Sequence, residues 1–201
     1  MMVSRRHWAQ RGFTLIEMMF VVAVLAILLT IAAPSMTNMI AMARLKSANA
    51  ELVTGIQYAR AEAIAHHVPV YIDFGAGGNP AMTCYVIHTG AILKCDCTQP
   101  PGSACPVFPN MTELNTTQLM SSTDVWFSAP AGAAAIGADG ELATAINPWV
   151  IDMSRISGKP GRLRTFVCSM GRPKVCSPDQ SVPGYRACPD PNKNIDACVT
   201  P

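Results

Sequence analysis

The residues best suited to chemistry in this chain form a basic segment in its last quarter. From Met153 to Pro178 the sequence contains no acidic residue. The basic residues in this window are Arg155, Lys159, Arg162, Arg164, Arg172 and Lys174. A guanidinium group binds a phosphate or carboxylate through two parallel hydrogen bonds. The segment is therefore a candidate site for an anionic ligand.

Two pieces of this segment share the order Gly-basic-x-basic. They are Gly161-Arg162-Leu163-Arg164 and Gly171-Arg172-Pro173-Lys174. Basic residues two apart on an extended segment project to the same side, and glycine lets the backbone approach a phosphate. The pattern predicts a phosphate-binding surface carried by Arg162, Arg164, Arg172 and Lys174. The alternative is a solvated basic turn that holds no ligand.

The charge of the whole chain conceals a strong asymmetry. The formal net charge is +2, with 15 Lys and Arg residues against 13 Asp and Glu residues. Residues 13–152 contain 4 basic and 10 acidic residues, whereas residues 153–201 contain 8 basic and 3 acidic residues. Such an uneven distribution points to an anionic partner for the C-terminal quarter.

A second chemically distinctive residue is Glu17, which lies in an apolar run. The run from Phe13 to Ala33 has only Thr14, Glu17 and Thr30 as polar residues. At ~1.5 Å per residue, a helix of this length spans the ~30 Å hydrocarbon core of a membrane. The run is preceded by Arg5, Arg6 and Arg11 and by no acidic residue. The positive-inside rule therefore predicts a cytoplasmic N-terminus and a translocated remainder.

A carboxylate inside a membrane helix usually marks function, because it costs ~2.5–3.5 kcal/mol or more at the bilayer centre. Glu17 lies near the cytoplasmic end, where this cost is lower. One alternative is an acid at the helix start that the helix dipole favours. Another is an ordinary secretory signal peptide, which needs a small-x-small cleavage site. The best candidate for such a site, residues 30–32, is poor, and Pro34 blocks cleavage after Ala33.

The cysteines all fall on the side of the chain that is expected to be translocated. They are Cys84, Cys95, Cys97, Cys105, Cys168, Cys176, Cys188 and Cys198. An even number of cysteines in an oxidising compartment indicates disulfide bonds, although the sequence leaves the pairing open. Pairs adjacent in sequence are our expectation: 84–95, 97–105, 168–176 and 188–198. Zinc binding by Cys95, Cys97 and Cys105 is the alternative, but no well-spaced histidine or second C-x-x-C accompanies them.

The chain carries no sequence motif of an enzyme. It has no G-x-S-x-G, P-loop, H-E-x-x-H or dinucleotide fingerprint. His66 and His67 are adjacent, so on a helix they do not share a face and are unsuited to a joint site. We therefore expect no catalytic residue, no metal and no cofactor. An anchored periplasmic enzyme, the third class of protein considered, has no motif in its favour.

The elements that position these residues follow from the hydrophobic pattern. We expect Pro34 to kink the first helix without ending it. Apolar residues then recur at spacings of three and four, which predicts one buried helix face. They are Leu45, Ala48, Leu52, Ile56, Ala59 and Ala63. The helix should end near His66 and His67, because Pro69 disfavours a helical conformation at the preceding residue.

Short β-rich runs follow the helix. We expect strands at residues 68–74, 83–88, 91–95, 125–128, 136 with 141–145, 150–156 and 165–168. Thr89 and Gly90 are a plausible hairpin turn between the second and third of these. The predicted fold class is α+β: a long N-terminal helix on an antiparallel sheet or small β-sandwich, with a disulfide-stabilised C-terminal region.

The stretch Arg11-Gly12-Phe13-Thr14-Leu15-Ile16-Glu17 resembles the processing site of type IV pilins and type II secretion pseudopilins. The resemblance implies that a prepilin peptidase cleaves after Gly12 and that the new N-terminal residue, Phe13, is methylated. It further implies that Glu17 pairs with the α-amine of Phe13 in a neighbouring subunit and sets the register of filament assembly.

The stretch from Glu51 to Ile64 resembles the second signature of the GspH/FimT family of minor pilins and pseudopilins. This resemblance implies a type IV pilin-like fold in a single-pass inner membrane protein with a periplasmic C-terminal domain. Other minor pilins or pseudopilins are its implied partners. The expected division is a leader (1–12), a transmembrane assembly helix (13–34), its amphipathic continuation (35–68), a periplasmic β-rich domain (69–176) and a Pro/Cys-rich tail (177–201).

DNA-binding members of this family carry a G-R-x-R motif towards the C-terminus, which serves DNA uptake in natural transformation. Gly161–Arg164 matches that motif in every position, and Gly171–Lys174 differs only in its final lysine. The resemblance therefore implies a minor type IV pilin that binds double-stranded DNA. The alternative is a minor pseudopilin of a type II secretion system, whose basic region faces an acidic protein or no ligand.

Overall fold

The computed structural model describes residues 13–77, 82–90, 95–105, 111–129, 134–143 and 148–189, without the side chains of residues 31–34, 76, 77 and 121. Gly12 and Cys198 lie outside these ranges. The chain divides into two compact units, residues 1–40 and residues 41–201. Each unit is described by itself.

The first unit is the beginning of helix α1 (Leu15–His66). The hydroxyl of Thr14 accepts a hydrogen bond from the backbone N–H of Glu17 at 3.3 Å, which caps the helix. Glu17 therefore lies in the first turn, where the helix dipole also favours a carboxylate. No single described helix satisfies a length and hydropathy test for a membrane span, but the segments Leu15–Thr30 and Ser35–His66 satisfy it together as a bent pair.

In the second unit, α1 buries the face that the sequence pattern predicts. All six of its predicted apolar positions, from Leu45 to Ala63, are buried. The helix ends at His66, and His67 adopts a left-handed conformation with φ of 52°, two residues before Pro69. The prediction of this helix face and of its C-terminal end is confirmed.

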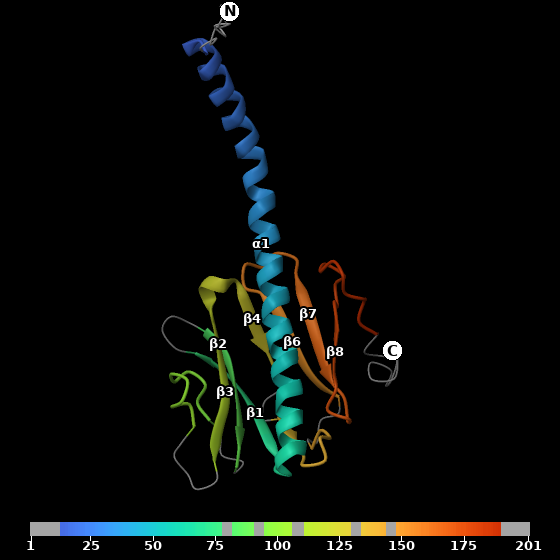
Figure 1. The fold of residues 1–201 in the computed structure, drawn as a ribbon. Coiled ribbons are helices and arrows are strands. Elements are labelled where there is room, and N and C mark those ends of the chain that lie inside the picture. Colours follow the sequence, from blue (N-terminus) through green and yellow to red (C-terminus); the bar gives the residue numbers. More distant parts are fainter. Residues whose placement is uncertain are drawn as a thin grey trace, which may run out of the picture. The chain divides into compact units, whose positions relative to one another are not determined.

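The described residues of the second unit also form two antiparallel four-stranded sheets (Figure 1). The first has the strand order β3-β2-β1-β5 and contains β1 (Val70–Gly77), β2 (Met82–Thr89), β3 (Thr112–Met120) and β5 (Ala134–Ile136). The second has the order β4-β6-β7-β8 and contains β4 (Val125–Ser128), β6 (Trp149–Arg155), β7 (Arg162–Val167) and β8 (Pro173–Cys176). The short 3-10 helix η1 (Ser121–Thr123) lies between β3 and β4.

The core lies between α1 and both sheets, because one hydrophobic cluster contains residues of all three. Leu52 of α1, Ile72 of β1 and Ile151 of β6 are members of it. A buried polar contact also joins the helix to the second sheet, since the hydroxyl of Thr165 donates to the side-chain oxygen of Asn49 at 2.9 Å. The expected α+β class with an antiparallel β-domain is confirmed.

Two edge strands escaped the sequence pattern, β3 because it is polar and β8 because it has only four residues and begins at a proline. β3 has the sequence TELNTTQLM and pairs with β2 only, and β8 begins at a proline and pairs with β7 only. Proline is tolerated at the first residue of a strand, particularly at a sheet edge. The expected hairpin across Thr89 and Gly90 is wrong, because β3 is the partner of β2 on that side. Of the strand expected at residues 91–95, residues 91–94 lie outside the described ranges.

The structure contradicts all four expected disulfide pairs. It contains the bonds Cys84–Cys97, Cys95–Cys105 and Cys176–Cys188, and Cys168 is also disulfide-bonded. The pairs Cys84–Cys95 and Cys97–Cys105 fail because the loop after Cys95 folds back on itself. The backbone N–H of Asp96 donates to the carbonyl of Ala104 at 2.7 Å, which places Cys105 beside Cys95. Cys97 then reaches Cys84 on β2.

The pairs Cys168–Cys176 and Cys188–Cys198 fail because the chain after β8 loops round and forms a parallel bridge with Ser177, just beyond the end of that strand. The backbone N–H of Ser177 donates to the carbonyl of Arg186 at 2.8 Å, and the N–H of Cys188 donates to the carbonyl of Ser177 at 3.3 Å. This arrangement brings Cys188 to Cys176, so neither cysteine is left for its expected partner.

Gly75 makes room for the Cys84–Cys97 bond. It pairs with Cys84 across the β1–β2 ladder, and a Cβ at this position would lie 2.7 Å from the sulfur of Cys97. We expect Gly75→Ala to lower the free energy of unfolding by ~1–3 kcal/mol through overpacking. Denaturant unfolding checks this. In a Cys84→Ala/Cys97→Ala background most of the penalty should disappear, and an unchanged penalty there would contradict the proposed cause.

Candidate anion-binding surface

The alternation of β7 decides which of the basic side chains face solvent. Leu163, Thr165 and Val167 are buried towards α1, so Arg162 and Arg164 project from the opposite, outer face of the sheet. On β8, Lys174 pairs with Phe166 and shares this outer face. We call Arg162, Arg164 and Lys174 the outer basic face.

This face also contains an acidic residue, Asp152, which lies just outside the acid-free window from Met153 to Pro178. Asp152 of β6 pairs with Arg164 of β7, and its carboxylate accepts two hydrogen bonds from the Arg164 guanidinium at 2.6 and 2.8 Å. Arg162 approaches the same carboxylate at 3.9 Å. The hydrogen bonds from Arg164 to Asp152 raise the pKa of the arginine above its usual value. Asp152 therefore neutralises part of the charge that the motif supplies.

Arg172 lies apart from the outer basic face, in the turn between β7 and β8. Its exposed side chain lines a hollow of about 590 Å³ together with Arg60, Ile64 and other residues in the last turns of α1. The structure thus brings three of the four predicted residues onto one face and places the fourth at the end of the hairpin.

The two motif glycines have structural roles, which corrects the expectation that they let the backbone approach a phosphate. Both are buried and both have positive φ, 141° at Gly161 and 66° at Gly171. A Cβ added at Gly161 would lie 2.8 Å from the Cδ of Arg155. A Cβ added at Gly171 would clash with the backbone carbonyl oxygen of Gly140. Glycine is needed at these positions for backbone conformation and close packing.

Arg155 belongs to the basic window but has a structural role. Its Nε donates to Asp124 at 2.9 Å, and its side chain is only 5% exposed. Asp124 also accepts hydrogen bonds from the backbone N–H and the hydroxyl of Ser157. Burial opposes ionisation of Asp124, but the bonds from Ser157 and Arg155 outweigh it and hold the pKa of Asp124 below its ordinary value. This cluster fixes the loop that leads into β7.

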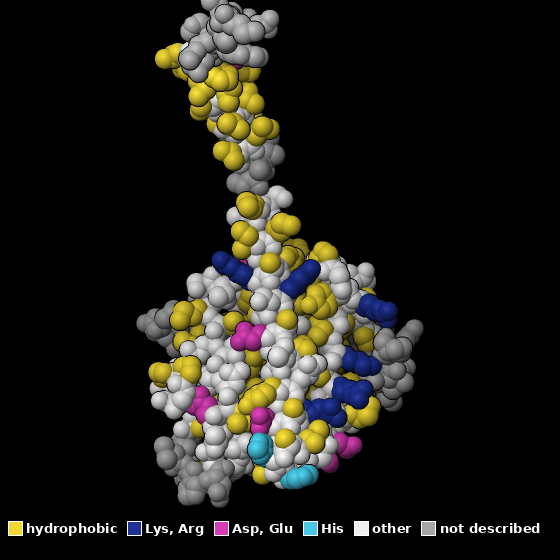
Figure 2. All heavy atoms as spheres, in the orientation of Figure 1, with side chains coloured by type: hydrophobic (Ala, Val, Ile, Leu, Met, Phe, Trp, Pro, Cys, Tyr) yellow, Lys and Arg dark blue, Asp and Glu magenta, His cyan; other side chains and the backbone are white. Residues whose placement is uncertain are grey.

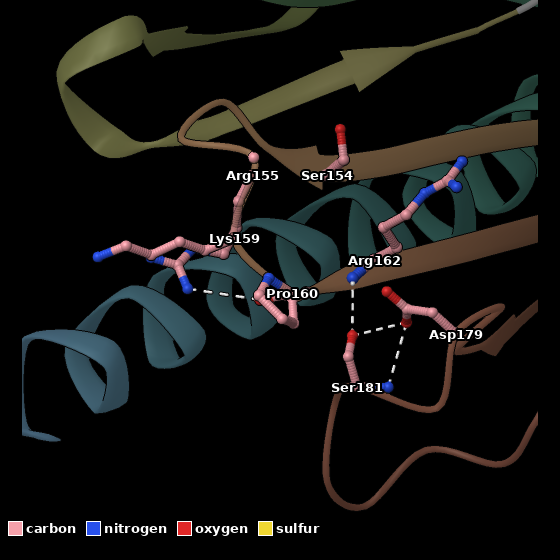
Figure 3. Close-up of a pocket in the computed structure, with 9 residues that line it drawn as sticks. Ser154, Arg155, Lys159, Pro160, Arg162, Asp179 and Ser181 are labelled. Carbon is pink, nitrogen blue, oxygen red and sulfur yellow. Dashed lines mark hydrogen bonds between the residues drawn. The ribbon is translucent and has the colours of Figure 1, made fainter.

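A hollow of about 580 Å³ beside that loop is lined by Lys159, Arg162, Asp179 and Ser181, among others (Figure 3). The hydroxyl of Ser181 accepts a hydrogen bond from the backbone N–H of Arg162. The carboxylate of Asp179 accepts hydrogen bonds from the backbone N–H and the hydroxyl of Ser181. Figure 3 shows Lys159 and Arg162 extending in opposite directions. The two positive charges therefore point away from each other, and Asp179 adds a negative charge to the lining. For both reasons the hollow does not focus positive charge on one ligand.

The cysteine-based zinc alternative is wrong, because Cys95, Cys97 and Cys105 are all disulfide-bonded. Among the described residues, His88, Cys95 and Cys105 do bring three potential ligand atoms within 4.8 Å of one another. Both of these sulfurs belong to one disulfide, whereas a metal ligand must be a thiolate. His88 instead lies 3.0 Å from Asp73 in a buried pair.

The remaining predicted site residues lie at the start of the described chain. Phe13 is 76% exposed, and Glu17 is exposed in the first turn of α1.

Comparisons with known proteins give two family matches. The family model described as "Prokaryotic N-terminal methylation motif" matches residues 9–33, and the one described as "Type II transport protein GspH" matches residues 48–171. No curated protein matches the chain.

Two of the similar solved structures come from different machines. The type IV minor pilin FimU of Pseudomonas aeruginosa is 18% identical with a TM-score of 0.48, over 70% of this chain and 93% of FimU. The minor pseudopilin EpsH from the Type 2 Secretion System of Vibrio cholerae is 12% identical with a TM-score of 0.42, over 68% of this chain and 99% of EpsH.

Proposed function

The chain belongs to the GspH family of minor pilins and pseudopilins, and from this premise we propose that it is a minor type IV pilin that binds double-stranded DNA. The N-terminal helix anchors it in the inner membrane after a prepilin peptidase has cleaved behind Gly12. Phe13 is then methylated, and Glu17 sets the position of the subunit in the filament. The second unit presents its basic residues to the DNA backbone.

The observation that carries the DNA proposal is the outer basic face. Arg162, Arg164 and Lys174 project from two adjacent strands on the same side of one sheet. A flat face of this kind suits contacts with phosphates along a duplex, which give affinity without reading base sequence.

The second candidate function is a minor pseudopilin of a type II secretion machine. The observation in its favour is Asp152, which already satisfies the guanidinium of Arg164 and approaches that of Arg162. On this view the basic residues form an intramolecular ion-pair network and contact no nucleic acid.

The direct test is a titration of the full-length oxidised chain, in an uncharged detergent, with duplex DNA at several salt concentrations. Each phosphate contact contributes about −0.9 to the slope of log affinity against log salt concentration. Because Asp152 already engages Arg164, contacts from Arg162, Arg172 and Lys174 predict a slope of roughly −2.7. Binding should disappear when Arg162, Arg164, Arg172 and Lys174 are all changed to Gln. No binding at low salt would leave the pseudopilin function as the better account.

Asp152 allows a sharper test, because its removal should strengthen binding. In Asp152→Asn, Arg162 and Arg164 no longer share a carboxylate, so we expect tighter DNA binding and a salt slope steeper by about 0.9. The ion pair is partly exposed, with Asp152 26% accessible, so the stability cost should stay within ~1 kcal/mol.

The matched control is Asp96→Asn, which changes the net charge equally. Asp96 is exposed in the loop beside the other sheet, where it bonds to Thr98, and asparagine can keep that acceptor. DNA affinity should change little in this variant. Equal gains in DNA affinity in Asp152→Asn and Asp96→Asn would mean that net charge alone causes the effect. The outer basic face would then no longer support the proposal.

A further inference from the structure

The hollow at the end of α1 differs from the outer basic face in the charges that surround its arginines. It is lined by Arg60 of the helix and by Arg172 of the β7–β8 turn, and no acidic residue lines it. Within the described residues neither arginine forms an ion pair with a carboxylate. In the outer basic face, by contrast, Arg162 and Arg164 share the carboxylate of Asp152.

The backbone brings these two arginines together although they are more than a hundred positions apart in the sequence. The Nε of Arg60 donates to the carbonyl of Gly140 at 3.1 Å, which fixes the direction of its guanidinium. The same Nε would lie 3.3 Å from a Cβ at Gly171, the residue immediately before Arg172. Arg60 is therefore held against the turn that carries Arg172, and no hydrogen bond to a described residue engages its terminal nitrogens.

The wider surface continues from this hollow. Figure 2 shows Lys and Arg side chains gathered in a column over the side of the second unit where β8 lies, extending towards the last turns of α1. An anionic strand that follows the β7–β8 hairpin would meet the hollow at the end of the hairpin. The Gln57 side chain at the rim adds a neutral hydrogen-bond donor.

We propose that Arg60 and Arg172 together form a phosphate-binding subsite at the helix end, which holds one phosphodiester of a bound duplex. This inference rests on the DNA-binding function proposed above and adds to it a residue, Arg60, that lies outside both Gly-basic-x-basic motifs. Two guanidinium groups without a competing carboxylate suit a single phosphate better than the neutralised pair on β7.

The test compares Arg60→Gln, Arg172→Gln and Arg44→Gln in the full-length chain in uncharged detergent, titrated with duplex DNA. Arg44 is an exposed arginine of the same helix far from the hollow, so its variant is the matched control. We expect each hollow variant to reduce the salt slope by about 1. Because both arginines would bind the same phosphate, the double variant Arg60→Gln/Arg172→Gln should lose little more than one phosphate contact. Arg44→Gln should retain the full slope. Arg60→Lys, which keeps the charge without the bond to Gly140, should recover part of the affinity lost in Arg60→Gln.

The two levels of inference fail in different ways. If the unsubstituted chain binds no DNA, the proposed function falls and the subsite falls with it. If it binds DNA and the hollow variants match Arg44→Gln in slope and affinity, the subsite alone is overturned. Thermal unfolding of each variant shows whether a loss of binding follows from a loss of folding, and Arg172→Gln is decisive there because no described contact depends on its side-chain nitrogens.

Discussion

Replacement of Asp124 by alanine should destabilise the second unit by ~3–5 kcal/mol, the typical effect of removing one partner of a buried ion pair. The Arg155 guanidinium would remain buried without its carboxylate, and Ser157 would lose two hydrogen bonds. Asp124 also has φ of 59°, a left-handed conformation that aspartate tolerates better than alanine. For a domain of this size the expected decrease in Tm is about 10 °C, measured by circular dichroism.

Two further variants test the cause of that loss. Lys159→Ala lies in the same basic window and is exposed, so it should stay within ~0.5 kcal/mol of the parent. Asp124→Asn keeps the tolerance for the left-handed backbone conformation and part of the hydrogen bonding. Its Tm should therefore lie between those of Asp124→Ala and Lys159→Ala. A parent-like Tm for Asp124→Ala would mean that Arg155 is satisfied in another way.

The same residue gives a pH dependence of known sign. The pKa of Asp124 is held below its ordinary value of 3.8, so its ionised form stabilises the fold above that pH. This contribution is lost as the pH falls through the lower pKa of the folded state. Urea unfolding of Asp124→Asn should therefore show a smaller decrease in stability below about pH 3.8 than the parent shows. Part of the acid sensitivity should remain in Asp124→Asn because of Glu113. Burial opposes ionisation of Glu113, but hydrogen bonds from Thr116, Gly102 and Ala104 outweigh it and lower its pKa.

Replacement of Glu17 by glutamine should nearly abolish recovery of the protein in sheared filaments while its amount in the membrane stays normal. Glutamine retains the size and helix propensity of the side chain and removes its charge. If the carboxylate pairs with the α-amine of a neighbouring subunit, the loss of one partner costs ~2–5 kcal/mol, which is more than tenfold in an assembly equilibrium. Immunoblots of sheared filaments and of membranes measure both quantities.

Thr14→Ala separates this role from helix capping. The Thr14 hydroxyl caps the first turn, so its removal weakens the helix start by ~1 kcal/mol while the carboxylate remains. We expect Thr14→Ala to enter filaments nearly as well as the parent. Comparable losses in Thr14→Ala and Glu17→Gln would favour the simpler role of Glu17 as an acid at the helix start.

The parts of this fold that could be predicted depend on local patterns. The buried face of α1 is periodic from Leu45 to Ala63, and β4 coincides with the β-rich run at residues 125–128, so both were predictable. The polar edge strand β3 was not, because its pairing with β2 arises from register and not from its own composition. The disulfide pairs depend on how the loop after Cys95 and the chain after β8 fold back, which spacing alone does not reveal.

The candidate site was predicted only in part, for a similar reason. The basic residues are visible in the sequence, but Asp152 is ten positions from Arg162 in the chain and adjacent to it only through the β6–β7 register. Arg60 is still more remote and reaches Arg172 because the helix end packs on the β7–β8 turn. A window of sequence without acids is therefore not a surface without acids.

The chain after β8 lies at the edge of the second sheet, where a strand of another molecule could pair. An edge strand such as β8 presents unpaired backbone groups that could recruit a strand from another molecule and start aggregation. Here the backbone of Arg186 and Cys188 occupies Ser177 at the end of that edge, and the Cys176–Cys188 bond fastens the segment there. The Cys176–Cys188 bond thus does more than stabilise the fold. A strand of another molecule that extended along β8 would meet this fastened segment at Ser177.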